Sequence, residues 1–239
     1  IKEIFLQLHE STEKLLARGA KGSLTVSLQP SFAIQWLVPR LNQFSEQHPD
    51  IDVRIKAVDL DEGSLTDDVD VAIYYGRGSW RNLHADKLHT EYLLPVCSPL
   101  LLNGSKPLKE PTDLRFHNLL HDGSRRAWKA WFTTQGFKHF NVNQGPIFSH
   151  SSMVLQAAIH GQGVALAHNV LARPDINSGR LIVPFNHVLQ TKDAHYLVCR
   201  DNQTELGKIA AFRQWMIELV QREQEDFQEQ QFNIAPVTD

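Results

Sequence analysis

Residues 23–31 read Ser-Leu-Thr-Val-Ser-Leu-Gln-Pro-Ser, and this stretch near the start of the 239-residue chain indicates the fold class. Side chains alternate between hydroxyl and apolar types up to Leu28, which is typical of a strand with one buried face. Pro30 then suits the first turn of a helix, because proline has no backbone N–H to leave unpaired there. The stretch therefore predicts a strand that runs directly into a helix.

The predicted helix continues to about Gln47 and carries a broad apolar face. That face contains Phe32, Trp36, Leu37, Leu41 and Phe44. Pro39 lies inside the helix and is expected to kink it. If the apolar face exceeds what one sheet covers, we expect it to pair two copies of the chain; otherwise it is internal core.

Further strands follow at residues 51–58 and 69–74, so the order is strand, helix, strand, turn, strand. This order implies a mostly parallel sheet with helices on its faces. A second set of elements comes later: strands at 92–97, 118–121, 140–148, 164–167 and 194–200, and helices at 126–134, 151–160 and 205–224. The sequence therefore predicts an α/β protein with two lobes. An amphipathic helix at 1–18 is either a pairing element or a terminal helix docked on its own domain.

The composition is that of an ordinary globular protein, with 42% apolar and 21% charged residues. The net charge of −3, from 24 basic and 27 acidic residues, argues against this segment gripping DNA by itself. No apolar run approaches the roughly 20 residues of a membrane helix, so no membrane partner is expected. Two cysteines, Cys97 and Cys199, are too few for a disulfide scaffold, and we expect free thiols. The sequence has neither a secretory signal nor an initiator Met, so we expect either that a preceding part was cleaved off or that the chain is a fragment. The low cysteine count makes the cytoplasm the expected compartment.

Two strand-to-helix junctions carry hydroxyl groups, one at Pro30-Ser31-Phe32 and the other at residues 149–152, Ser-His-Ser-Ser. A helix start offers unpaired N–H groups and a favourable dipole to an anion. Ligands of open α/β sheets also bind at the carboxyl ends of strands. The alternative is that Ser31 and Ser151 only cap their helices.

Other residues are expected to line the ligand crevice at these strand ends. Tyr75 and Arg77 follow the third strand, where Arg77 suits a carboxylate, and Ser124 follows the strand that ends at His121. Each is equally compatible with an exposed loop. The candidate ligand-binding set is Pro30, Ser31, Phe32, Tyr75, Arg77, Ser124, Ser149, Ser151 and Ser152.

Catalytic and metal motifs are missing from the sequence. His117 and His121 bracket a predicted strand, so they do not share a helical face, and no Cys-x-x-Cys or His-Glu-x-x-His spacing occurs. Gly161-x-Gly163 ends a helix instead of starting one, unlike a dinucleotide fingerprint. No Gly-x-Ser-x-Gly elbow occurs either. We therefore expect neither an enzyme nor a cofactor or metal.

These segments resemble the effector domain of LysR-type transcription regulators over nearly the whole chain. The segments that carry the resemblance are 22–27 (GSLTVS), 36–41 (WLVPRL), 68–73 (DVDVAI), 94–99 (LPVCSP), 144–167 (QGPIFSHSSMVLQAAIHGQGVALA) and 206–215 (LGKIAAFRQW). The resemblance implies two Rossmann-like lobes with a double crossover, of the type II periplasmic-binding-protein kind. It further implies the end of a linker helix at 1–21, one lobe from 22–93 and 197–226, the other from 94–196, and a tail at 227–239.

The resemblance also implies partners and a function. In this family a small-molecule effector binds between the lobes, subunits associate as dimers or tetramers, and a separate N-terminal domain binds promoter DNA. The longer segments are most similar to family members that control glycine-cleavage genes. These imply glycine or another small carboxylate as the effector, purines as a further signal and an accessory repressor protein as a partner. The main rival is a periplasmic-type solute-binding protein for a small anion; an enzyme is a weaker third reading.

Overall fold

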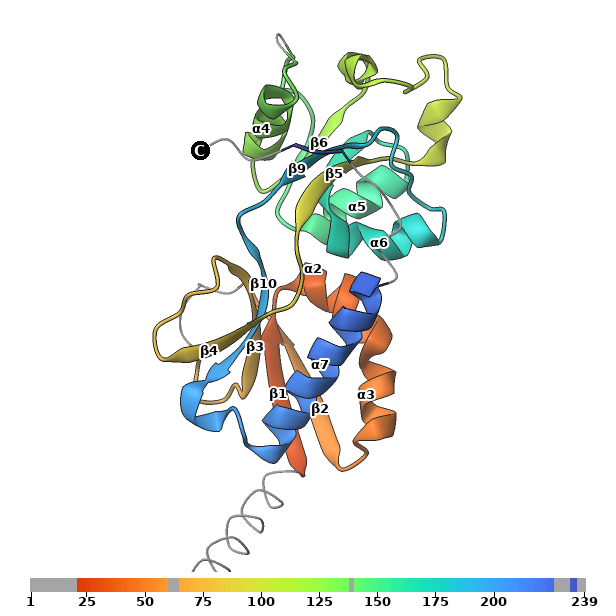
Figure 1. The fold of residues 1–239 in the computed structure, drawn as a ribbon. Helices are drawn as coiled ribbons and strands as arrows, with labels where there is room; N and C mark the ends of the chain where they lie inside the picture. Colours follow the sequence, from red (N-terminus) through yellow and green to blue (C-terminus); the bar gives the residue numbers. More distant parts are fainter. Residues whose placement is uncertain (1–20, 60–64, 138–139, 226–232, 236–239) are drawn as a thin grey trace, which may run out of the picture. The chain divides into compact units, whose positions relative to one another are not determined.

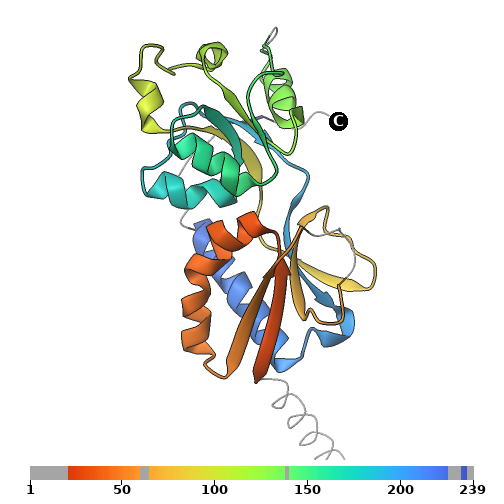
Figure 2. The ribbon, with the colours of Figure 1, turned by 180° about the vertical axis from the view of Figure 1, so that it is seen from behind.

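The computed structural model describes residues 21–59, 65–137, 140–225 and 233–235. Within these ranges the chain forms two compact units (Figures 1 and 2). Unit 1 contains residues 21–29, 37–59, 65–89 and 193–225, and unit 2 contains residues 30–36, 90–137, 140–192 and 233–235. The helix expected at 1–18 lies outside the described residues, as does most of the tail.

Unit 1 is built on a mixed five-stranded sheet in the order β2-β1-β3-β10-β4. Its strands are β1 (Gly22–Leu28), β2 (Ile51–Ala57), β3 (Val71–Gly76), β4 (Leu83–Lys87) and β10 (Ala194–Arg200). β1 runs parallel to β2 and β3, as the strand order predicts, whereas β10 is antiparallel to both β3 and β4. The expectation of parallel pairing is confirmed for the three strands on which it rested, and the whole sheet is mixed because β10 pairs antiparallel with β3 and β4.

Two helices of unit 1 pack on this sheet, α3 (Leu41–Gln47) on β2 and α7 (Gly207–Glu225) on β1 (Figure 1). Their apolar faces meet each other through aromatic rings. The Phe44 ring lies edge-on to that of Phe212 at 5.2 Å between centroids and also contacts Trp215. These three side chains are almost completely buried and form the core on this side of the sheet.

The segment from Pro30 to Gln47 was predicted to be one helix kinked at Pro39, but the structure divides it into several short helical pieces. It consists of α2 (Pro30–Phe32), a π-helical stretch (Ala33–Leu37), a 3-10 turn (Val38–Arg40) and then α3. Pro39 cannot supply the N–H that a regular α-helix needs, and the backbone changes its hydrogen-bond period there. The chain passes from unit 2 to unit 1 within this irregular stretch, between Trp36 and Leu37.

The apolar face of this segment belongs to the core. Phe32, Trp36, Leu37 and Phe44 are each at most 1% exposed. The face that was expected to pair two copies of the chain is therefore internal, and it supplies no argument for a dimer.

Unit 2 has a six-stranded sheet in the order β11-β9-β5-β8-β6-β7. Its strands are β5 (Tyr92–Val96), β6 (Leu119–Asp122), β7 (Ile147–Phe148), β8 (Val164–His168), β9 (His187–Gln190) and β11 (Asn233–Ala235). Its helices are α4 (Arg126–Thr134), α5 (Ser151–Ile159) and α6 (Asn169–Asn177). β8, β6 and β7 are parallel neighbours, so their carboxyl ends share one edge of the sheet, and α5 begins at that edge.

The predicted strand at 140–148 is mostly wrong, since only Ile147 and Phe148 are extended as β7. Gly145 has a φ of +97°, a conformation that only glycine adopts readily, and a side chain there would collide with the carbonyl of Leu119. Pro146 follows and cannot donate to a neighbouring strand. The helix at 126–134 is confirmed as α4, whose Trp128, Trp131 and Phe132 are buried in the core of unit 2.

Candidate functional site at the start of helix α5

The serine-rich junction lies at the carboxyl edge of the parallel strands of unit 2. β6 ends at Asp122, β7 ends at Phe148, and α5 starts at Ser151. The N–H of Gly123 donates to the carbonyl of Phe148 at 2.8 Å, which ties the two strand ends together. This is the edge where open α/β sheets bind ligands.

Ser31 caps helix α5 from a distant part of the chain. Its hydroxyl oxygen accepts the Ser152 backbone N–H at 3.0 Å and lies 3.3 Å from the Ser152 hydroxyl. Ser31 is only 5% exposed, and α2, on which it lies, contacts α5 within unit 2. The residue in the N-cap position of α5, His150, makes no such side-chain bond. The capping alternative therefore holds for Ser31, but the helix it caps is not its own.

Ser151, the first residue of α5, does not cap this helix. Its hydroxyl donates to Oδ2 of Asp122 at 2.5 Å, and both residues are half-buried. Among the described residues, Oδ1 of Asp122 has no hydrogen-bond partner. The edge thus combines a carboxylate with the electropositive start of a helix. Such a pair of opposite charges suits a zwitterion better than a simple anion, which Asp122 would repel.

The other expected residues of unit 2 lie around this junction. The Ser149 hydroxyl lies 2.6 Å from Nδ1 of His150 and is exposed. The Ser124 oxygen accepts the Arg126 N–H at 3.4 Å, at the start of α4. Pro30 begins α2, and Phe32 is fully buried against Trp36. Ser124 and Phe32 therefore have structural contacts that explain them without a ligand.

Tyr75 and Arg77 belong to unit 1. The Arg77 guanidinium, mostly exposed, pairs with the carboxylate of Asp193 at 2.6 Å. The Tyr75 ring packs against His195 at 5.0 Å between centroids. Arg77 was expected to pair with the carboxylate of a ligand, whereas in the structure it pairs with the carboxylate of Asp193.

Asp122 is the residue of this site that the sequence reasoning missed. It directly follows the strand predicted to end at His121, so its position at a strand end was a usable signal. In the described part of the chain, His, Cys, Asp and Glu side chains form no cluster of three or more. Nor does any described helix have the length and apolarity needed to cross a membrane.

Comparisons with known proteins agree on one family. The model of the LysR substrate binding domain matches residues 17–221. The glycine cleavage system transcriptional activator of Escherichia coli (strain K12) is 66% identical over 227 residues, which cover 95% of this chain and 74% of that protein. Its homolog in Haemophilus influenzae is 42% identical over 228 residues, covering 95% of this chain and 75% of that protein. Among solved structures, the effector domain of AmpR of Pseudomonas aeruginosa has a TM-score of 0.72 at 29% identity, covering 86% of this chain and 98% of that one.

Proposed function

Because this chain belongs to the LysR family of transcriptional regulators, whose substrate-binding domain it carries, we propose that it senses an amino-acid effector in order to activate glycine-cleavage genes. Its relatives at 66% and 42% identity are transcriptional regulators. The chain is therefore neither an enzyme nor a periplasmic solute-binding protein. The expected α/β fold of the family is confirmed.

The proposed effector is glycine or another small amino acid, held at the start of α5. The observation that carries this proposal is the Ser151–Asp122 hydrogen bond beside the helix start. In this arrangement the effector carboxylate lies at the N-terminal end of α5, where the helix dipole favours negative charge. The effector ammonium donates to Asp122, in a charge-assisted hydrogen bond.

Binding then favours the protein conformation with the higher effector affinity, and that shift is the regulatory signal. In our proposal a separate DNA-binding domain responds to this conformational shift at the promoter. The regulator acts as a dimer or tetramer in the cytoplasm. An accessory repressor protein is a further partner. Family membership supports the use of effectors, DNA and oligomers in general. The particular effector and repressor are the finer part of the proposal.

Calorimetry with three small ligands tests the effector site. Glycine carries both charges, acetate lacks the ammonium and methylammonium lacks the carboxylate, so we expect glycine to bind far more tightly than either. Asp122→Asn keeps the side-chain shape and loses the charge. Removing a charge-assisted hydrogen bond costs about 1.5–3 kcal/mol, so glycine should bind about 10- to 140-fold more weakly to this variant. The affinity for acetate should not fall.

Asp52→Asn is the matched control, since Asp52 is a largely exposed residue of β2 in unit 1. A second test combines Ser31→Ala with Ser151→Ala. Ser31→Ala removes an uncharged hydrogen bond worth about 0.5–1.5 kcal/mol, and Ser151→Ala removes a hydrogen bond to the Asp122 carboxylate worth about 1.5–3 kcal/mol. If the folded double variant and Asp122→Asn both bind glycine as the wild type does, the effector site lies elsewhere and both serines have purely structural roles.

A further inference from the structure

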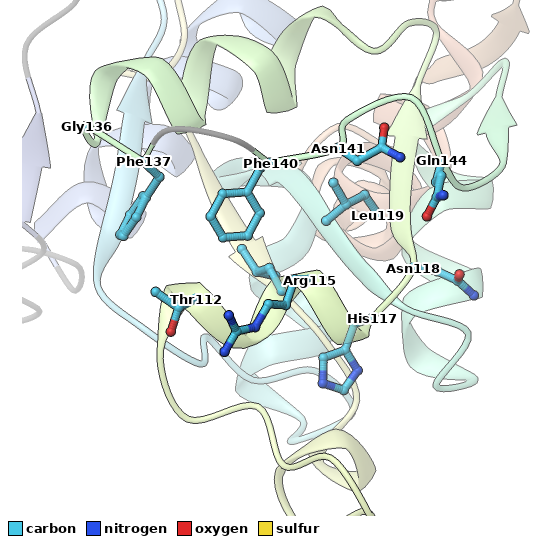
Figure 3. A pocket seen from close by; sticks show the side chains of 11 residues that line it. Thr112, Arg115, His117, Asn118, Leu119, Gly136, Phe137, Phe140, Asn141 and Gln144 are labelled. Atoms are coloured by element: carbon cyan, nitrogen blue, oxygen red, sulfur yellow. The ribbon is translucent and has the colours of Figure 1, made fainter.

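Unit 2 contains a cavity of about 540 Å³ that is separate from the start of α5. It lies beside Leu119, the first residue of β6, whereas Asp122 is at the other end of that strand. One side comes from the 3-10 turn Pro111–Phe116 and the residues that follow it, and the other from the segment after α4 (Figure 3). The lining residues are Thr112, Leu114, Arg115, His117, Asn118, Leu119, Gly136, Phe137, Phe140, Asn141 and Gln144.

Two aromatic rings form the apolar wall of this cavity. Phe140 stacks on Phe132 at 4.2 Å between ring centroids, and Phe137 stacks on Trp131 at 5.9 Å. Phe132 and Trp131 are themselves buried in the core. The core therefore holds both rings in place, and Figure 3 shows them across the cavity from Thr112 and Arg115.

The described residues that line the cavity carry a net positive charge. Of its lining residues, all of them described, Arg115 is the only one with a formal charge near pH 7, and none is acidic. Burial lowers the pKa of His117 below its ordinary value, so that ring is neutral. The Arg115 guanidinium also lies over the exposed ring of Phe116, 4.7 Å from its centroid. The remaining polar groups are the hydroxyl of Thr112 and the amides of Asn118, Asn141 and Gln144.

We propose that this cavity is a second ligand site and that it binds a flat aromatic carboxylate. The ring of the ligand lies against Phe137 and Phe140, its carboxylate pairs with Arg115, and amide groups satisfy the remaining polar edge. The volume falls in the range of about 300–1,000 Å³ that is usual for small-molecule pockets and has room for two fused rings. This site shares no residue with the effector site at α5, so it is independent of the proposed function.

Calorimetry with 2-naphthoate tests the proposal directly. Two comparison ligands separate its parts: 2-naphthamide has the rings without the charge, and trans-decahydro-2-naphthoate has the charge without the aromatic rings. We expect 2-naphthoate to bind at least about tenfold more tightly than the amide, which lacks the charge-assisted hydrogen bond. It should bind about two- to tenfold more tightly than the decahydro compound, which lacks the aromatic contacts. Equal binding of the amide would overturn the assignment of an anion, and no binding of 2-naphthoate would overturn the site.

Variants locate the bound ligand. Arg115→Gln, at an exposed position, and Phe140→Leu should each weaken 2-naphthoate binding about tenfold. Arg126→Gln is the matched control, because Arg126 is an exposed arginine of α4 outside the cavity. Asp122→Asn should leave 2-naphthoate binding unchanged, which separates this site from the effector site. If Arg115→Gln, which removes no buried side chain, binds 2-naphthoate as the wild type does, the proposal is wrong.

Discussion

Replacing Ser31 by alanine removes the group that caps helix α5. The Ser31 oxygen accepts the Ser152 N–H at 3.0 Å in a position that water hardly reaches. Alanine cannot accept this hydrogen bond, and no side chain at the N-cap position of α5 replaces it. The variant therefore keeps the shape of α2 and leaves the partly buried N–H of Ser152, at the start of α5, without its acceptor.

The size of the effect follows from two estimates of the same loss. An unsatisfied buried donor costs about 1–3 kcal/mol, and the loss of a capping side chain costs about 1 kcal/mol. We expect Ser31→Ala to destabilise unit 2 by about 1–2 kcal/mol. For a protein of this size each kcal/mol lowers Tm by about 2–4 °C.

A local readout is needed because two compact units need not unfold in a single transition. Hydrogen exchange at the Ser152 amide reports the first turn of α5 directly and should become faster in the variant. Ser45→Ala is the control, since Ser45 is exposed on α3 and bonds only its own helix, at 3.3 Å from the Leu41 carbonyl. If Ser31→Ala matches the wild type both in Tm and in exchange at Ser152, the Ser31 hydroxyl does not stabilise α5.

Three further predictions concern packing, pH and thiols. Gly163→Ala would press a methyl group into the Asn118 carbonyl and should destabilise unit 2 by about 1–3 kcal/mol; an unchanged urea midpoint contradicts this. Because burial lowers the pKa of His117, the unfolded chain takes up its proton first as the pH falls below about 6.5. Stability should therefore fall from that pH down to the folded pKa, and His117→Gln should flatten this part of the Tm profile; an identical profile in the variant argues against it. Cys97 and Cys199 are buried free thiols, and burial raises the pKa of Cys97 to about 12 and also raises that of Cys199. A thiol reagent such as DTNB should react with neither in the native protein and with both in urea, and rapid reaction in the native state would count against this.

Local patterns were sufficient for the elements that depend on near neighbours in the chain. Alternation over residues 23–28 predicted β1, and the apolar spacing at 126–134 predicted α4. These patterns hold because a strand or helix repeats over two to four residues. They failed at 140–146, where the positive φ of Gly145 and the missing N–H of Pro146 do not fit a strand, and the extended backbone begins only at Ile147. They also missed β4, β9 and α6, the last of which contains Pro174.

Local sequence patterns were therefore enough to predict the α/β class and the position of most elements, and the resemblance to known regulators indicated the family. Which residues contact one another depends on the tertiary structure. Ser31 bonds Ser152 across 121 positions, and Ser151 bonds Asp122 across 29. Such contacts depend on the order of strands in a sheet and on where each connection returns, and no local period encodes either. For the same reason no local pattern indicated the cavity beside Arg115 and Phe140, whose walls come from segments on either side of α4.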